Sequence, residues 1–141
     1  MAENEDKPKI DVRFIVEAQG KPPEYVNKEL NQVRELIDGM RDVEVYDKKM
    51  EPPEEIKDGL YSCLMDLGLY FSNVETLFFA TLRFGPSAVI VLGPEELKIN
   101  FHELSNSLND ICSFLRTLSQ DNTTLKIDKY RIMKKLKTLK K

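Results

Sequence analysis

The chain has few of the residues that usually carry catalysis or metal binding: one histidine and two cysteines among 141 residues. His102 has no nearby partners for a metal centre or a catalytic triad, so we interpret it as a surface or helix-capping residue. Cys63 and Cys112 form no C-x-x-C pair and are too few to cross-link a small secreted fold, so we expect two core thiols. The sequence therefore predicts a protein that is not an enzyme and needs no metal or cofactor.

Long hydrophobic runs and phosphate-binding loops are also missing. No segment approaches the roughly 20 apolar residues that span a bilayer, and the polar, acidic stretch Met1–Lys9 does not resemble a secretory signal. Gly85-Pro86 and Gly93-Pro94 lack the sequence context of a G-x-G-x-x-G or G-K-[ST] loop, so we interpret both as turns. These absences predict a cytoplasmic protein.

Charge is divided unevenly along the chain. Residues 123–141 contain eight Lys or Arg and one Asp, whereas the preceding residues contain 13 basic and 23 acidic side chains. The composition, with 41% hydrophobic and 32% charged residues, is that of an ordinary globular protein. We therefore expect a polar flank over residues 1–9, a single domain over 10–119 and a basic tail over 120–141.

The first half of the domain alternates between strand and helix patterns. Apolar residues at every second position predict a strand with one core face, formed by Val12, Phe14, Val16 and Ala18. A helix is expected from Pro22-Pro23 to Gly39, with Val26, Leu30, Val33 and Ile37 as its apolar stripe. A second, weakly alternating strand follows at residues 43–49. After it we expect an exposed acidic loop that includes Glu54, Glu55 and Asp58-Gly59.

The second half repeats this order. The clearest alternation predicts a long central strand with Tyr61, Cys63, Met65, Leu67 and Leu69 inward. Ser72 and Glu75 have the spacing of a capping box, so a helix should begin near Asn73 and end at Gly85-Pro86. The run Ala88 to Leu92 is apolar on both faces, which is typical of an interior or covered strand.

The resulting order predicts an α+β, ferredoxin-like βαββαβ fold, with two helices on one face of a four-stranded antiparallel sheet. The other face would be open and partly apolar, with Ile15, Tyr46 and Leu64 as candidate oligomer contacts. Either Val89 and Val91, or Ala88, Ile90 and Leu92, would join them. Because this face offers Tyr46 at most and several carboxylates, RNA binding through paired aromatic side chains is disfavoured.

An amphipathic helix is expected from about Phe101 to Leu118, after a short extended segment that starts at Leu97. Its apolar residues follow alternating four- and three-residue intervals: Leu97, Phe101, Leu104, Leu108, Ile111, Leu115 and Leu118. This stripe either packs on its own domain or pairs with a second chain, and in the second case Leu108 and Leu115 would be oligomer contacts. A homodimer is the oligomer we favour.

The basic tail drawn as a helix is amphipathic, with Leu125, Ile132, Leu136 and Leu139 on one side. Its candidate contact residues for nucleic acid or another partner are Lys126, Lys129, Arg131, Lys134, Lys135, Lys137, Lys140 and Lys141. Lysines in such a segment make salt-sensitive, sequence-independent phosphate contacts. A membrane surface, a protein partner or the chain's own acidic body are the other possible targets.

Residues 73–97 also resemble a known segment. Arg83-Phe84-Gly85-Pro86, Val89, Val91-Leu92, Pro94 and Leu97 match the end of the C-terminal extension that follows the WYL domain in many prokaryotic transcription regulators. This resemblance implies a ferredoxin-like unit, although the chain has no helix-turn-helix or WYL-like domain. The chain is also similar to small archaeal proteins without an assigned activity. We therefore expect a self-associating, non-enzymatic binding or regulatory module, with a nucleic-acid-associated protein as the alternative.

Overall fold

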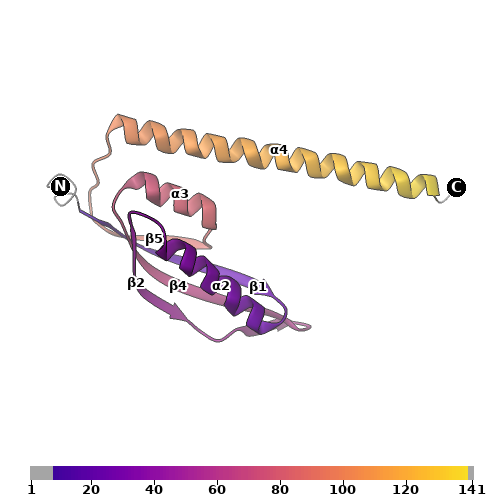
Figure 1. Ribbon diagram of the computed structural model, residues 1–141, viewed down its shortest axis with the longest axis horizontal. Helices are drawn as coiled ribbons and strands as arrows, with labels where there is room; N and C mark the ends of the chain where they lie inside the picture. Colours follow the sequence, from indigo (N-terminus) through magenta and orange to yellow (C-terminus); the bar gives the residue numbers. More distant parts are fainter. Residues whose placement is uncertain (1–7, 140–141) are drawn as a thin grey trace. The chain divides into compact units, whose positions relative to one another are not determined.

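The computed structural model describes residues 8–139, with side chains described up to residue 137 (Figure 1). Among these residues the fold is α+β, with five strands and three helices. In chain order they are β1 (Ile10–Gly20), α2 (Pro23–Asp38), β2 (Val43–Met50), β3 (Glu54–Lys57), β4 (Leu60–Phe71), α3 (Val74–Phe84), β5 (Ala88–Gly93) and α4 (Phe101–Leu139). The chain divides into two compact units, Met1–Ser107 and Leu108–Lys141, and the division lies inside α4 rather than between a helix and a tail.

All strands belong to one antiparallel sheet with the order β2-β4-β1-β5, and β3 pairs separately with β4. β4 is the longest strand, with 12 residues, and it pairs with three others. The prediction of a long central strand in this position is confirmed.

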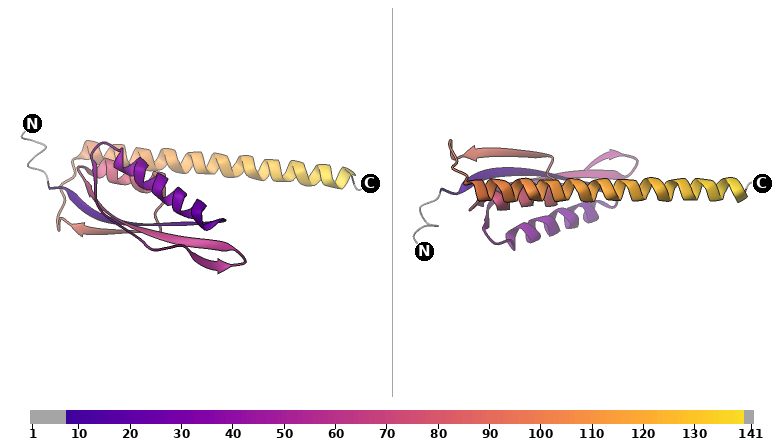
Figure 2. Two further views of the ribbon diagram at one scale, coloured as in Figure 1. Left: turned by 60° about the horizontal axis from the view of Figure 1, so that its bottom comes forward. Right: turned by 90° about the horizontal axis from the view of Figure 1, so that it is seen from above.

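The core lies between the sheet and the helices α2 and α3, which cover the same face (Figures 1 and 2). The predicted inward side chains of β1 and β4 are buried there, except Tyr61, which is partly buried, and Phe14 packs against Phe71 with ring centroids 5.8 Å apart. From α2, Val26, Leu30 and Ile37 are buried, and Val33 is partly buried. The alternation read from the sequence is therefore the alternation between core and open face.

A β-bulge explains why β2 alternates only weakly in the sequence. Val45 pairs with Leu69 and Asp47 pairs with Gly68, so Tyr46 is the extra residue on β2. The extra residue shifts the phase, so that Val43 and Val45 before the bulge and Met50 after it all pack toward the core. A strict period of two cannot recover such a strand.

Two local predictions in this region are wrong. Glu54–Lys57 is not a loop but β3, which returns to β4 through Asp58 and Gly59, both at positive φ, as in a type I′ hairpin turn. The cap of α3 is Asn73, whose side chain accepts the Thr76 N–H, and not the Ser72–Glu75 pair. Its C-cap, Gly85, is left-handed with φ 52°, as the Gly-Pro signal indicated.

β5 is also not an interior strand. Among the described strands it pairs only with β1, at the edge of the sheet, and its apolar side chains are exposed. Because both faces of an edge strand at this position lack cover within the described structure, an apolar run there does not indicate burial. Cys63 is buried as expected, but Cys112 on α4 is exposed and is not a core thiol.

The last helix begins where the sequence placed it but does not end there. The Asn100 side chain accepts the Glu103 N–H and caps α4, which starts at Phe101. The helix continues past Leu118 to Leu139, for 39 residues, and is drawn without interruption in Figure 2. The segment expected as a separate basic tail is therefore the second half of α4.

Candidate functional site

The face of the sheet opposite α2 and α3 is the first candidate surface. Ile15, Leu64 and Tyr46 all lie on it, as the sequence predicted. Ile15 pairs with Asp66, and Leu64 pairs with Glu17 two positions along, so Ile15 and Leu64 are diagonal neighbours. Tyr46 lies farther along the sheet, over Gly68. The structure thus divides this open face into an apolar part and a polar part.

The polar part is organised around Arg13. Its guanidinium donates Nε–H to Asp66 Oδ1 at 2.7 Å and Nη2–H to Asp47 Oδ2 at 2.9 Å, which joins three strands. These two hydrogen bonds, led by the one to Asp66, raise the pKa of Arg13. The hydrogen bond from Arg13 lowers the pKa of Asp47. Arg13 therefore stays charged and acts as a cross-strand clamp.

Tyr46 packs over the polar part of the open face. Its ring stacks on Tyr70 at 4.3 Å between centroids, and its hydroxyl donates to Asp11, which raises the pKa of Tyr46. The ring lies so close to Gly68 that a Cβ there would be 2.7 Å from the Tyr46 Cζ. Glycine is therefore required for this close approach. The polar part is held together by its own hydrogen bonds.

The apolar part borders a groove of about 680 Å³ between β3 and the central strands. Ile15, Ile56 and Leu64 line it, and Ile56 and Leu64 are each 53% exposed. Glu51, Glu54 and Glu55 form an acidic edge of the same groove. Ile56 could not be predicted as a lining residue from the sequence, because it lies in the segment expected to be a loop.

The register of β5 decides which of its side chains share this face. Arg13 pairs with Ile90 and Ile15 pairs with Ala88, and paired residues of antiparallel strands point to the same side. Ala88 and Ile90 therefore lie on the open face, whereas Val89 and Val91 pair with the core residues Phe14 and Val12. Of the two alternatives from the sequence, the second applies to Ala88 and Ile90, whereas Leu92 lies at a register shift and has no partner on β1.

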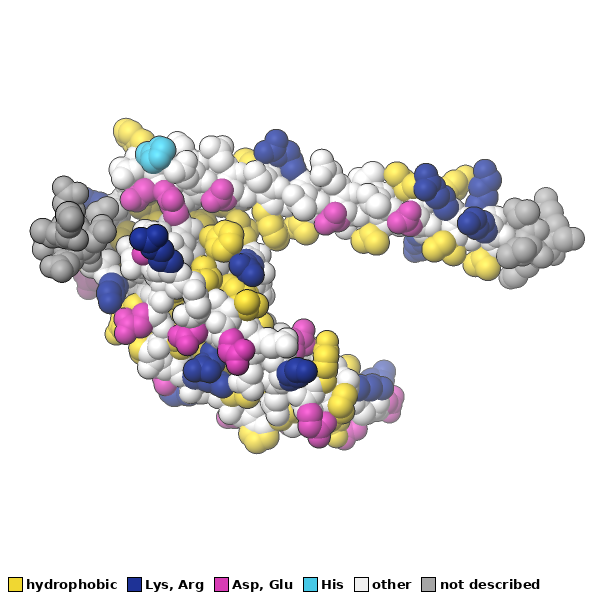
Figure 3. All heavy atoms as spheres, in the orientation of Figure 1, with side chains coloured by type: hydrophobic (Ala, Val, Ile, Leu, Met, Phe, Trp, Pro, Cys, Tyr) yellow, Lys and Arg dark blue, Asp and Glu magenta, His cyan; other side chains and the backbone are white. Residues whose placement is uncertain are grey.

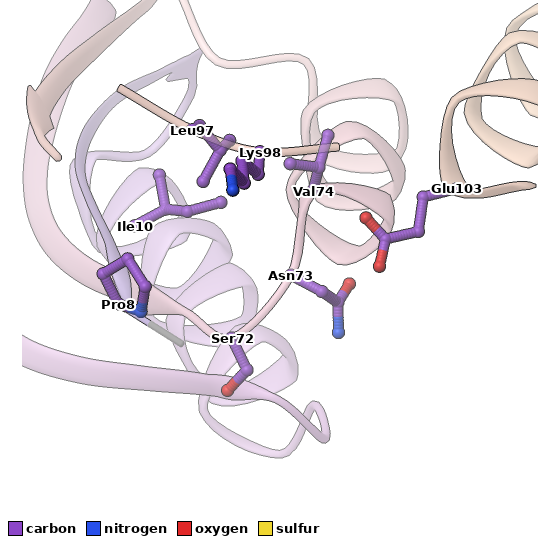
Figure 4. Close-up of a pocket in the computed structure, with 8 residues that line it drawn as sticks. All are labelled: Pro8, Ile10, Ser72, Asn73, Val74, Leu97, Lys98 and Glu103. Carbon is purple, nitrogen blue, oxygen red and sulfur yellow. The ribbon is translucent and has the colours of Figure 1, made fainter. Parts of the chain in front are cut away.

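A second, smaller hollow of about 80 Å³ lies at the start of α3 (Figure 4). Ile10, Val74 and Leu97 supply its apolar lining, and the cap residue Asn73 and the Glu103 side chain border it. His102 is exposed one residue away from Glu103, with Nε2 3.3 Å from Asn106 Nδ2. The hollow is far smaller than the roughly 300–1,000 Å³ of usual small-molecule pockets.

Within residues 8–139, no group of three or more His, Cys, Asp or Glu side chains could hold a metal ion. None of the described helices has an apolar stretch that would let it cross a membrane.

The unit Leu108–Lys141 is the second candidate surface, and its described part is helix alone. Apolar and basic side chains alternate around α4, and the basic ones gather toward its C-terminal end (Figure 3). Leu108 and Leu115 are 52% and 57% exposed. The predicted basic contacts Lys126, Lys129, Arg131, Lys134, Lys135 and Lys137 are all exposed on this helix, and Lys140 and Lys141 lie outside the described residues.

These observations define an α+β protein with a five-stranded antiparallel sheet and a long C-terminal helix. The chain belongs to the MJ0538 family, whose model matches residues 11–141 and so spans both units. No curated protein and no solved structure matches the chain.

Proposed function

We propose that the chain is a non-enzymatic binding module that works as a homo-oligomer, with α4 as the element of self-association. The observation that carries this proposal is the exposed apolar side of α4 in a unit that contains no other described element. Six of its leucine and isoleucine side chains are between 44% and 64% exposed: Leu108, Leu115, Leu118, Leu125, Ile132 and Leu136.

An isolated helix such as this one needs a surface to pack against. Helices gain most of their stability in proteins from packing an amphipathic face, because propensity alone makes an isolated helix marginal in water. Burying apolar surface contributes about 25 cal/mol per Å². From Leu108 to Leu139, α4 extends about 48 Å, which exceeds the length of about 40 Å expected for the 12-residue β4. A second copy of the same helix has the same length as α4, so it could pack along the whole apolar side of this segment.

The sheet unit has a different part in the proposal. The strand order β2-β4-β1-β5 supports the inference of a ferredoxin-like unit to which β3 is added. Part of its open face is polar, because the side chains of Arg13 and Tyr46 form hydrogen bonds there. The helix α4 therefore offers the longer apolar surface for self-association. The groove beside Ile15 and Leu64 is left as the surface for a further contact. The likeness of residues 73–97 to the WYL extension stays a hypothesis and does not support this proposal.

Sedimentation equilibrium of the full chain tests the proposal. We expect a mass of twice the 16.3 kDa of one chain, with dissociation only at low protein concentration. A single-chain mass at every concentration would contradict self-association.

A nucleic-acid-associated protein is the second candidate, favoured by the exposed lysines and arginine in the C-terminal half of α4. Such contacts release counterions, so binding of labelled RNA or duplex DNA should weaken steeply with salt. Replacing Lys126, Arg131 and Lys137 with Gln should weaken this binding, whereas Gln at Lys28, Lys48 and Lys57 of the sheet unit should not. Equal affinities for the two triple variants would exclude phosphate contact by α4.

A further inference from the structure

We propose that two copies of α4 form a parallel, in-register coiled coil; this deepens the proposed function, on which it rests. The observation is that the two apolar stripes read separately from the sequence lie on one continuous helix and in one register. From Leu108, alternating steps of three and four residues lead through Ile111, Leu115, Leu118, Asn122, Leu125, Lys129 and Ile132 to Leu136. These nine positions form the seam of the coiled coil: they are the a and d positions of four heptads and the a position of a fifth, and seven are leucine or isoleucine.

The two polar positions in this seam are the first argument for the parallel orientation. Asn122 and Lys129 both occupy a positions. In a parallel pair each a residue meets the same residue of the other chain, so two Asn122 side chains can hydrogen-bond to each other. The two Lys129 side chains also face each other, and the Asp128 carboxylates at the flanking g positions offset their repulsion. In an antiparallel pair a positions face d positions, which would set Asn122 and Lys129 against leucine or isoleucine and leave buried polar groups unsatisfied.

The flanking charges are the second argument. In a parallel pair a g position faces the e position of the next heptad on the other helix, so Asp121 meets the partner's Lys126. The g residue also borders the hole that receives the following a side chain, so Lys129 meets the partner's Asp128. In an antiparallel pair g positions face g positions, and Asp121 would meet the partner's Asp121 or Asp128. Only the parallel arrangement pairs opposite charges.

The orientation also has a consequence for the molecule. Because each sheet unit precedes α4 in the chain, a parallel pair joins both sheet units to the same end of the coiled coil. The basic halves of the two helices then lie together, and the charge that could face a polyanion is doubled. An antiparallel pair would instead separate these basic halves to opposite ends.

Disulfide cross-linking of the full chain tests the orientation. The parent is Cys112→Ser, since Cys112 is exposed; Cys63 is buried and burial raises the pKa of its thiol, so it should stay unreactive. In this parent, Ile132→Cys and, separately, Ile111→Cys place one thiol at an off-centre d position. Each variant alone should oxidise mostly to a covalent dimer on a non-reducing gel, and the parent should give none.

The alternatives have distinct outcomes. A chain that sediments as a dimer but gives no Ile132→Cys dimer, and instead cross-links when Ile132→Cys is mixed with Leu115→Cys or Leu108→Cys, would overturn the parallel orientation while leaving the proposed function intact. A dimer with no cross-link in any combination would place the interface outside the seam and also overturn the inference. A monomeric parent would reject both proposals.

Discussion

A chain with Leu108→Asp and Leu115→Asp is expected to sediment as a monomer at concentrations where the unchanged chain is a dimer. Each substitution would set an unpaired carboxylate in an apolar layer, and both copies would carry it. Burying an ionised group without a partner costs several kcal/mol, so the dimer should weaken by at least about 1,000-fold, or about 4 kcal/mol. Sedimentation equilibrium measures the dissociation constant directly.

The matched control adds the same charges to the opposite side of the same helix. Ser113→Asp and Gln120→Asp lie at outward heptad positions and should leave the dimer almost unchanged. Circular dichroism should show that the sheet unit is folded in both double variants, since all four positions lie in the unit Leu108–Lys141. If the variant with charged Leu108 and Leu115 positions stays dimeric, the seam is not the contact.

Phe14→Ala is expected to lower the free energy of unfolding of the sheet unit by about 3–5 kcal/mol. Phe14 is fully buried on β1, between β4 and β5, and packs against Phe71. Truncation removes its buried surface and leaves a cavity in a layer that close packing does not readily refill. A loss of this size is comparable with the whole stability of a small domain. Urea unfolding at fixed protein concentration measures it.

Phe79→Ala is the matched control because it removes the same atoms from α3, where the ring is 45% exposed. We expect it to cost less than half as much as Phe14→Ala. Equal losses would mean that the core is not centred on β1 and β4. Fixed protein concentration matters, since self-association would itself add to the apparent stability.

Several elements could be predicted from the sequence, because their local patterns agree with the way these elements pack in the core. The strict alternation of β1 and β4, the proline start of α2 and the Gly-Pro end of α3 all act within a few residues. The Asp58-Gly59 turn also carried a signal for a hairpin, since Asp-Gly favours the two positive-φ positions of a type I′ turn, but the charged flanks concealed β3. The pattern of β2 was weak for another reason. Its bulge at Tyr46 shifts the alternation by one residue, whereas the prediction assumed a constant period of two.

The candidate surfaces also include some features that could be predicted from the sequence and others that could not. The open-face position of Ile15 and Leu64 followed from alternation alone. The clamp of Arg13 on Asp47 and Asp66 did not, because it joins residues 34 and 53 positions apart, and only strand pairing brings such groups together. The side of β5 that joins the open face was likewise decided by its register on β1.

The sequence alone determined the class of the fold, the buried faces of β1, α2 and β4, and the charge division between body and C-terminal segment, since these depend on periodicity and composition. The tertiary structure decided the rest. It placed β5 at the edge of the sheet and set the Tyr46 ring close against Gly68. It also joined the apolar seam and the basic segment into one helix. The physical reason is that hydrogen-bond partners across a sheet and the continuation of a helix past a polar residue such as Asn122 depend on contacts and cooperativity beyond any local window.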